Sequence, residues 1–306
     1  MMIRPARFRS NPLAAVSNRF MKAIDASPDE EQAVAEREFD GIANALREAG
    51  VRVVEVADTA EPDTPDAVFP NNWMSTHADG SLVLYPMQVA NRRPERRPEI
   101  IEQLTGEEGF RVSEIIDLSP HEDDGHYLEG TGSLVLDRVN RIAYACLSAR
   151  TSLDVLGEFS QRLDYDVVAF EATDREGVPI YHTNVMMSVG EEIAVICDEA
   201  IADDAQREAV LRSLSSTGHE IVSISFDQVL AMAGNMLELE SDTGDHIMAM
   251  SGQAHRALSA DQIAAIERHT TIVSSPIDNI ENSAGGSVRC MLAEIHLPVQ
   301  DAHEMS

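Results

Sequence analysis

The amino-acid sequence predicts an α/β fold in which five similar units close into a ring, a five-bladed α/β-propeller. The first observation is an internal repeat, because the order helix, strand, hairpin recurs roughly every 50 to 60 residues. The second is that the hairpin of the fifth unit has only one expected strand, Cys290–Ile295. An additional strand that belongs to none of the five units, Met2–Phe8, is expected near the N-terminus. Pairing these two strands would close the ring and remove an exposed sheet edge.

The first unit shows the order most clearly. Ser27 is a predicted N-cap, Pro28 is the first helical residue and Glu30 completes a capping box. Gly50 ends this helix, and Val51–Val56 is the strand that we expect to follow it.

The later units repeat this order, after a first hairpin over Trp73–Tyr85. Their helices are expected at Arg97–Leu104, Leu153–Leu163, Asp203–Leu214 and Ala260–Arg268. The strands after these helices are expected at Phe110–Ile116, Tyr165–Phe170, Glu220–Ile224 and Thr270–Ser274. The hairpins are expected at Gly132–Ala145, Val185–Ile196, Met236–Met250 and Met291–Ile295. An open, doubly wound sheet is the alternative fold, but it would need a phosphate-binding loop, and no G-x-G-x-x-G or Walker sequence follows a strand.

The charge of the chain excludes one class of partner. Asp and Glu number 53 against 23 Lys and Arg, which gives a net charge of −30, and Lys22 is the single lysine. Such a field repels phosphate backbones, so we expect no nucleic-acid partner. One hypothesis is that the acidic, lysine-poor composition reflects the cytoplasm of a halophile, where a high salt concentration screens the repulsion between the charges. The alternative is GC-rich coding with a mildly acidic surface.

Composition also points to a cytoplasmic protein. Three cysteines in 306 residues form no disulfide framework, and the first residues lack the hydrophobic stretch of a signal peptide. No apolar run approaches the roughly 20 residues of a membrane span, so no membrane partner is expected. The oligomeric state stays open, with a homodimer as one option.

Polar residues that carry chemistry stand at the start of each expected hairpin. In a ring of equivalent units, equivalent loops meet at one end of the axis, so these residues should gather there. They are Asn72, Glu129, His182, Asn184, Asn235 and Cys290. A thiol, an imidazole, a carboxylate and several amides in one place are the components of an active site.

At these positions the sequence resembles the guanidine-modifying superfamily, which includes arginine deiminases, dimethylarginine hydrolases and amidinotransferases. The stretches that carry the resemblance are Phe69–Trp73, Leu128–Gly132, His182–Asn184 and Asn282–Cys290. The similarity covers essentially the whole chain and is strongest to arginine-deiminase-related citrulline-utilisation hydrolases. It implies the pentein fold, a five-bladed pseudo-symmetric α/β-propeller, and a single catalytic domain over residues 1–306.

The resemblance implies a mechanism. By position, Cys290 matches the nucleophile, His182 the general acid and base, and Glu129 the carboxylate that grips the substrate. A covalent thiol intermediate divides one hard displacement at an amidine carbon into two easier steps. No cofactor is implied, and no metal is expected because the chain has no C-x-x-C or H-x-x-x-H pair.

The sequence departs from the arginine-acting pattern at two positions. Asn72 stands where those enzymes usually carry an aspartate, and Asn184 stands where they carry the aspartate of a His-x-Asp motif. An amide both donates and accepts hydrogen bonds, whereas a carboxylate only accepts. With Asn235 as a third amide, the site favours a neutral small-molecule ureido substrate such as citrulline over arginine.

Other interpretations remain open at this point. The enzyme could be an amidinotransferase, in which an amine resolves the adduct, or the chain could be a non-catalytic pentein that only binds, as ribosome-binding penteins do. Cys146 and Cys197 lie in apolar runs and are expected in the core. One arginine, Arg7 or Arg289, is expected to hold a substrate carboxylate.

Overall fold

A computed structural model describes residues 1–22 and 26–300, in which the strands form five small sheets, one of two strands and four of three. The two-stranded sheet contains β1 (Met2–Arg4) and β2 (Glu55–Ala57). One three-stranded sheet contains β3 (Met74–Thr76), β4 (Ser81–Leu84) and β5 (Glu114–Asp117), and the next contains β6 (Leu134–Asp137), β7 (Ile142–Cys146) and β8 (Asp166–Phe170). A third contains β9 (Met187–Val189), β10 (Ile193–Ile196) and β11 (Glu220–Ser223). The fourth contains β12 (Leu237–Glu240), β13 (His246–Ser251) and β14 (Thr271–Ser275).

Each three-stranded sheet has the same topology. Its first two strands pair antiparallel as a hairpin, and its second and third strands pair parallel. A helix connects the two parallel strands, as a parallel connection requires. The predicted repeat of helix, strand and hairpin therefore has a physical counterpart in one sheet per repeat.

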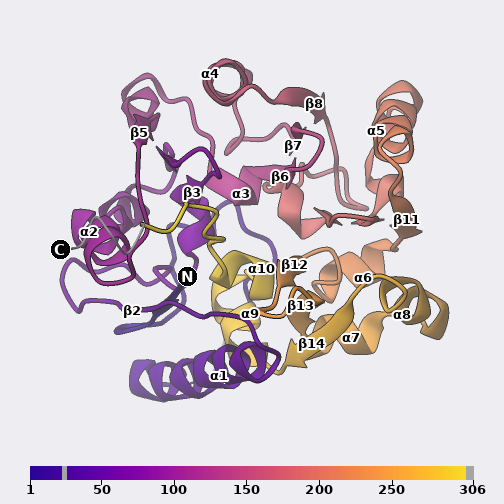
Figure 1. Ribbon diagram of the computed structural model, residues 1–306. Coiled ribbons are helices and arrows are strands. Elements are labelled where there is room, and N and C mark those ends of the chain that lie inside the picture. The colour runs from indigo at the N-terminus through magenta and orange to yellow at the C-terminus, as the bar shows by residue number, and fades with distance from the viewer. Residues whose placement is uncertain (23–25, 301–306) are drawn as a thin grey trace.

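One set of helices lies at the outside of the sheets, and a second set consists of helices of seven residues or fewer. The outer helices are α1 (Pro28–Glu48), α2 (Pro98–Gly106), α4 (Leu153–Leu163), α5 (Asp204–Ser216) and α8 (Ala260–Ile266). The shorter helices are α3 (Gly130–Ser133), α6 (Phe226–Leu230), α7 (Gly252–Ala257), α9 (Asp278–Ala284) and α10 (Val288–Met291). Figure 1 shows the outer helices at the periphery, and α3 and α10 near the middle of the molecule.

Helix α1 begins as the sequence predicts. The Ser27 side chain accepts a hydrogen bond from the Glu30 amide, and the Glu30 carboxylate accepts one from the Ser27 amide at 2.9 Å. Gly50 adopts a positive φ of 83°, which lets the chain turn away after the helix. The apolar side of α1, with Phe39 and Leu46, is fully buried.

The expected pairing of the chain ends is not formed as a strand ladder. Only Met2–Arg4 of the predicted strand is extended, and it pairs in parallel with β2. Cys290 lies in helix α10, so the predicted strand Cys290–Ile295 is wrong. Two backbone hydrogen bonds, of 2.7 and 3.0 Å, join Met1 to Ala293. A continuous closed sheet is absent from the described residues, and closure of the ring stays a prediction.

Two predicted strands begin later than expected. After α1, the Val51 amide still donates to the Leu46 carbonyl, and the strand starts only at Glu55. In the next unit Phe110 forms a bridge with Val299, so the ladder with β4 starts only at Glu114. In both cases a neighbouring segment takes the backbone groups of the first residues.

The described residues include no helix with the length and apolar character that crossing a bilayer requires.

An aromatic cluster packs α4 onto the sheet beneath it. Phe159 is fully buried, with its ring centroid 5.6 Å from that of Tyr165. On the same helix, the exposed fraction of Leu153 is 59%. The two positions therefore share a helix but differ in burial.

This difference predicts the stability of two variants. Phe159→Ala should lower the free energy of unfolding by about 3–5 kcal/mol, because it leaves a cavity in the core. Leu153→Ala should change it by less than about 0.5 kcal/mol. Urea unfolding followed by circular dichroism measures both, and equal losses would contradict the packing described for α4.

Candidate active site

The predicted site residues stand directly before the inner strands of successive sheets, or in the helix that takes the place of the last one. Asn72 ends the 3₁₀ turn Pro70–Asn72 before β3, and Glu129 precedes α3 and β6. His182 and Asn184 lie at the 3₁₀ turn Thr183–Val185 before β9, Asn235 precedes β12, and Cys290 lies in α10. Because β3, β6, β9 and β12 all start at this side, their preceding residues meet there.

Two glycines allow this close approach. A Cβ atom on Gly132 would lie 2.5 Å from Asn72 Nδ2 and 2.7 Å from His182 Nδ1. Gly130 has a positive φ of 47°, and a Cβ there would lie 2.2 Å from the Asn71 carbonyl oxygen. A larger residue at either position would push the site residues apart.

The sulfur of Cys290 faces two amides. Asn184 Nδ2 lies 3.4 Å from Sγ and Asn235 Nδ2 lies 3.3 Å from it. Asn235 Nδ2 also donates to the Asn184 carbonyl at 3.0 Å, which fixes the orientation of the Asn235 amide. Cys290 is 4% exposed. Two N–H donors directed at one sulfur stabilise negative charge on it.

Helix α10 holds this sulfur in place. The Ser287 hydroxyl donates to a Glu281 carboxylate oxygen at 2.6 Å, and the Cys290 amide donates to the Ser287 carbonyl at 2.9 Å. Burial raises the pKa of Glu281 to about 7.

His182, Glu129 and Arg150 form a buried triad. His182 Nε2 lies 2.8 Å from Glu129 Oε2, and Arg150 Nη1 donates to the same oxygen at 3.2 Å. The other oxygen of Glu129 accepts from the Gln88 amide at 2.9 Å. Glu129 is 0% exposed and Arg150 2%.

The triad fixes the charge states of its members. Burial by itself would raise the pKa of Glu129, but the Arg150 charge and the His182 hydrogen bond together hold it well below its usual range. Burial lowers the pKa of His182 to about 4, although Glu129 acts in the opposite direction. At neutral pH the imidazole is therefore neutral, with its proton on Nε2 facing the carboxylate and Nδ1 left as an acceptor.

Arg92 orients the Asn72 side chain. Arg92 Nη1 donates to Asn72 Oδ1 at 2.7 Å, and Nε and Nη2 donate to the two Glu95 carboxylate oxygens at 2.8 and 2.9 Å. Since the guanidinium only donates, the oxygen of Asn72 must face it and the NH₂ group must point away.

Three amides of the site keep one buried polar atom each without a hydrogen-bond partner among the described residues. These atoms are Asn72 Nδ2, Asn184 Oδ1 and Asn235 Oδ1. Buried polar groups are nearly always paired in folded proteins. One donor and two acceptors are therefore available here to a ligand.

A cavity of about 20 Å³ is lined among others by Cys290, His182, Asn72, Arg92 and Arg150, but not by Glu129, Asn184 or Asn235. This is room for about one water molecule. Asn18 also lines it, with its Nδ2 donating to the Ala284 carbonyl at 3.1 Å and the Gly285 carbonyl at 3.3 Å. The site is closed, and these two hydrogen bonds join the two segments that cover it, residues 14–18 and residues 284–286.

A larger cavity of about 460 Å³ is lined by other residues, and neither Cys290 nor His182 is among them. The thiol and imidazole therefore place the candidate chemistry at the smaller cavity.

The six predicted site residues lie together, although their roles stay predictions. Sequence reasoning missed Arg92, Arg150 and Asp66, which line the same cavity. The two arginines could be found only from the tertiary structure, because nothing in the local sequence distinguishes them among the 22 arginines of the chain. Neither Arg7 nor Arg289, one of which was expected to hold a substrate carboxylate, lines this cavity.

Both of those arginines are engaged elsewhere. Arg7 lies on the surface beside Glu61, at 3.3 Å. Arg289 Nη2 donates to Glu294 at 2.7 Å, and its side chain lines the larger cavity. Cys146 and Cys197 lie in the core as expected, and burial raises the pKa of each thiol to about 12.

Comparisons with solved structures show what the chain is similar to. Unliganded AgrE matches with a TM-score of 0.75 and 20% identity over 98% of this chain and 39% of that protein. ArgZ, an arginine dihydrolase from the ornithine-ammonia cycle in cyanobacteria, matches with a TM-score of 0.74 and 18% identity, over 97% of this chain and 40% of ArgZ. The chain thus spans about two fifths of these two proteins.

Two further structures match this chain over their full length. The N-terminal domain of ArgZ, covalently bound to a reaction intermediate, gives a TM-score of 0.73 and 18% identity, with 97% of this chain and 98% of the domain covered. A dimethylarginine dimethylaminohydrolase adduct with S-methyl-L-thiocitrulline gives 0.63 and 14% identity, with 95% and 96% covered. At these identities the likeness shows the fold, which is the α/β pentein fold. No curated protein matches the chain.

A family model described as N,N dimethylarginine dimethylhydrolase, eukaryotic, matches residues 4–297, nearly the whole chain. Together with the shared fold, this match shows that the chain belongs to the N,N dimethylarginine dimethylhydrolase family of the guanidine-modifying superfamily.

Proposed function

We propose that this protein is a cysteine-dependent hydrolase that cleaves a C–N bond in a linear ureido or guanidino amino acid, with a ureido compound such as citrulline preferred. The observation that carries the proposal is the Cys290 sulfur, held between two amide donors in one cavity with His182. Similar proteins support it, since ArgZ is an arginine dihydrolase and the dimethylarginine enzyme forms an adduct with a thiocitrulline.

The first half-reaction forms the covalent adduct. Neutral His182 takes the proton of the Cys290 thiol through Nδ1, and the thiolate attacks the ureido carbon. The new C–S bond forms as the C–N bond to the terminal NH₂ breaks, and the imidazolium gives its proton to that nitrogen, which leaves as ammonia. Glu129 stabilises the imidazolium during this transfer.

The second half-reaction releases the product. His182, neutral again, takes a proton from a water that attacks the carbonyl carbon of the adduct. The C–S bond breaks, the thiolate of Cys290 recovers the proton, and the carbamate that leaves decomposes to an amine and carbon dioxide. A cavity that is lined by Cys290 and His182 and has room for about one water can hold the attacking water.

The unpartnered amide atoms support a neutral ureido group. Asn72 Nδ2 is a donor for the ureido oxygen, and the Oδ1 atoms of Asn184 and Asn235 are acceptors for its N–H groups. A guanidinium carries no acceptor for Asn72 Nδ2, and it would need a carboxylate that is free to pair with it. Glu129 is already held by Arg150 and His182. Asp66 also lines the cavity, where its Oδ2 lies 3.9 Å from Arg92 and accepts from Asn11 at 2.7 Å, and burial raises the pKa of this carboxyl.

Arg150 is the proposed partner of the substrate carboxylate. It lines the cavity, and its Nη2 donates to the Ser17 hydroxyl at 2.6 Å and to the Ala14 carbonyl at 3.3 Å. These partners belong to residues 14–18, the first of the two segments that cover the cavity. When the segment moves to admit an amino acid, a carboxylate can replace them bidentately.

The direct test is mass spectrometry of the protein quenched during turnover with citrulline and, separately, with arginine. We expect an adduct on Cys290, and loss of several orders of magnitude in kcat for Cys290→Ala. Cys197→Ala is the matched control, because this thiol is in the core and should leave adduct and turnover unchanged. Full turnover by Cys290→Ala would refute the proposal.

The substrate preference is tested by Asn72→Asp. The new carboxylate keeps its contact with Arg92 but replaces the donor Nδ2 with an acceptor. The ratio of kcat/KM for arginine to that for citrulline should rise by about tenfold or more, because a hydrogen bond to the ureido oxygen is lost. Steady-state kinetics with both compounds measures it. A wild-type enzyme that prefers arginine, or a variant with an unchanged ratio, would contradict the assignment of Asn72.

A further inference from the structure

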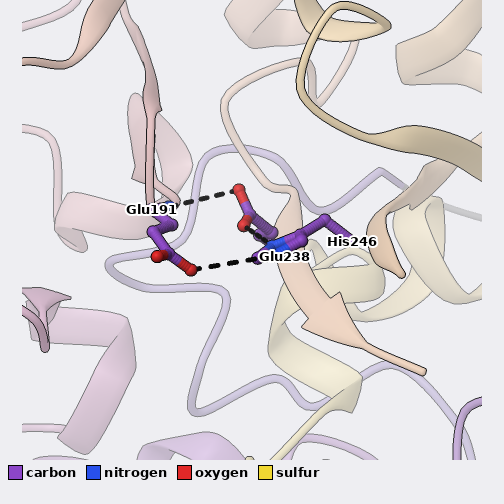
Figure 2. Close-up of side chains that lie close together, drawn as sticks. All are labelled: Glu191, Glu238 and His246. Carbon is purple, nitrogen blue, oxygen red and sulfur yellow. Dashed lines mark hydrogen bonds and ion pairs between the residues drawn. The ribbon is translucent and has the colours of Figure 1, made fainter. Parts of the chain in front are cut away.

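Two glutamates and a histidine converge where the β9–β10 turn lies against the β12–β13 hairpin. Glu191 lies in the turn between β9 and β10, Glu238 lies in β12, and His246 is the first residue of β13 (Figure 2). Strand β9 leads from Asn184 toward Glu191, whereas Glu238 is the second residue of β12 and lies close to Asn235 in the sequence. None of the three residues lines the small cavity beside Cys290, so the cluster is separate from the thiol site.

The donor atoms of the cluster meet closely. His246 Nδ1 lies 2.7 Å from Glu238 Oε1, and the other ring nitrogen, Nε2, lies 3.8 Å from Glu191 Oε2, so a shared ion would be bound by one of these two nitrogens. One donor atom from each residue lies within 4.8 Å of the other two. Among residues 1–22 and 26–300, no other three His, Cys, Asp or Glu side chains converge in this way.

Glu238 has the least exposed side chain of the three. Its side chain is only 10% exposed, and its Oε2 accepts from the Glu191 backbone amide at 3.3 Å. Gly190 permits this approach, because a Cβ there would lie 1.9 Å from Glu238 Oε2. A carboxylate held this firmly in a turn of the neighbouring sheet is preorganised to share a ligand with Glu191.

The group needs a positive charge. Two carboxylates, those of Glu191 and Glu238, face one imidazole. A divalent cation bound between them would supply positive charge and engage both carboxylates.

All three residues line the larger cavity of about 460 Å³. An ion held by them would have its remaining coordination positions directed at a space large enough for water or a small anion. Three protein ligands with an open position are the pattern of an accessible zinc site.

We propose that Glu191, Glu238 and His246 bind a divalent transition-metal ion, and that this ion is Zn²⁺. One imidazole and two carboxylates match Zn²⁺, whose bonds to such ligands are about 2.0–2.2 Å. Mg²⁺ and Ca²⁺ prefer all-oxygen sites with more ligands. The ion would join the β9–β10 hairpin to the β12–β13 hairpin and stabilise the folded chain. The proposal is independent of the chemistry at Cys290.

The test is calorimetric titration of the EDTA-treated full chain with ZnCl₂. We expect one saturable site in the wild-type protein and a rise in melting temperature with Zn²⁺. His246→Gln and Glu238→Gln should weaken binding by at least about tenfold and remove the thermal shift. Glu191→Gln, at a more exposed side chain, should weaken it as well and keeps the test valid if Glu238→Gln fails to fold.

Two control variants separate this site from others. His269 also lies between two carboxylates, 3.2 Å from Glu192 and 2.9 Å from Glu220, but this trio does not converge on one point. His269→Gln should bind Zn²⁺ as the wild type does, and so should Cys290→Ser, which removes the thiol. No saturable binding in the micromolar range, binding that survives in His246→Gln, or binding lost only in Cys290→Ser would each overturn the proposal.

Discussion

The interaction on which the site depends is the buried contact of Glu129 with Arg150 and His182. A carboxylate without access to water is costly unless charged and hydrogen-bonding partners surround it, and removing one partner from such a group typically costs about 3–5 kcal/mol. Here the partners are Arg150, His182 and the Gln88 amide. The triad ties the loop before α3 to the loop before β9, and so fixes the imidazole at the cavity that contains Cys290.

The amides then determine what the site can hold. Two of them direct N–H groups at the sulfur, and the third is turned by Arg92 so that its NH₂ group remains unpartnered. The Glu129 carboxylate is already neutralised inside the triad, and Asp66, the carboxylate that lines the cavity, lies 3.9 Å from the Arg92 guanidinium. In this way the same buried ion pair that orients the base also favours a neutral ligand, which links the electrostatics of the fold to the proposed ureido preference.

The sequence predicted much of this arrangement because the repeat places equivalent residues at equivalent points. Glu129 and His182 could be found from their place before an inner strand, and Cys290 from the equivalent point of the fifth unit, although helix α10 replaces the expected strand there. The capped start of α1 was equally readable, since its signal is local. Arg150 was not, because its contacts with Glu129 and Ser17 join distant segments. The contact of Glu191 with Glu238 and His246 escaped for the same reason, because it joins two sheets. Pro5, which cannot donate to a ladder, follows the last residue of β1.

The central claim is that the buried triad keeps Glu129 ionised and His182 neutral at neutral pH. Its most direct test is NMR of ¹⁵N-labelled imidazoles across pH 5–8, with the His182 signal assigned from His182→Gln. Because burial lowers the pKa of His182 to about 4, the ring should stay neutral throughout, with its proton on Nε2. A ring that becomes protonated near pH 6.5, the ordinary value, or that carries its single proton on Nδ1, would contradict the account.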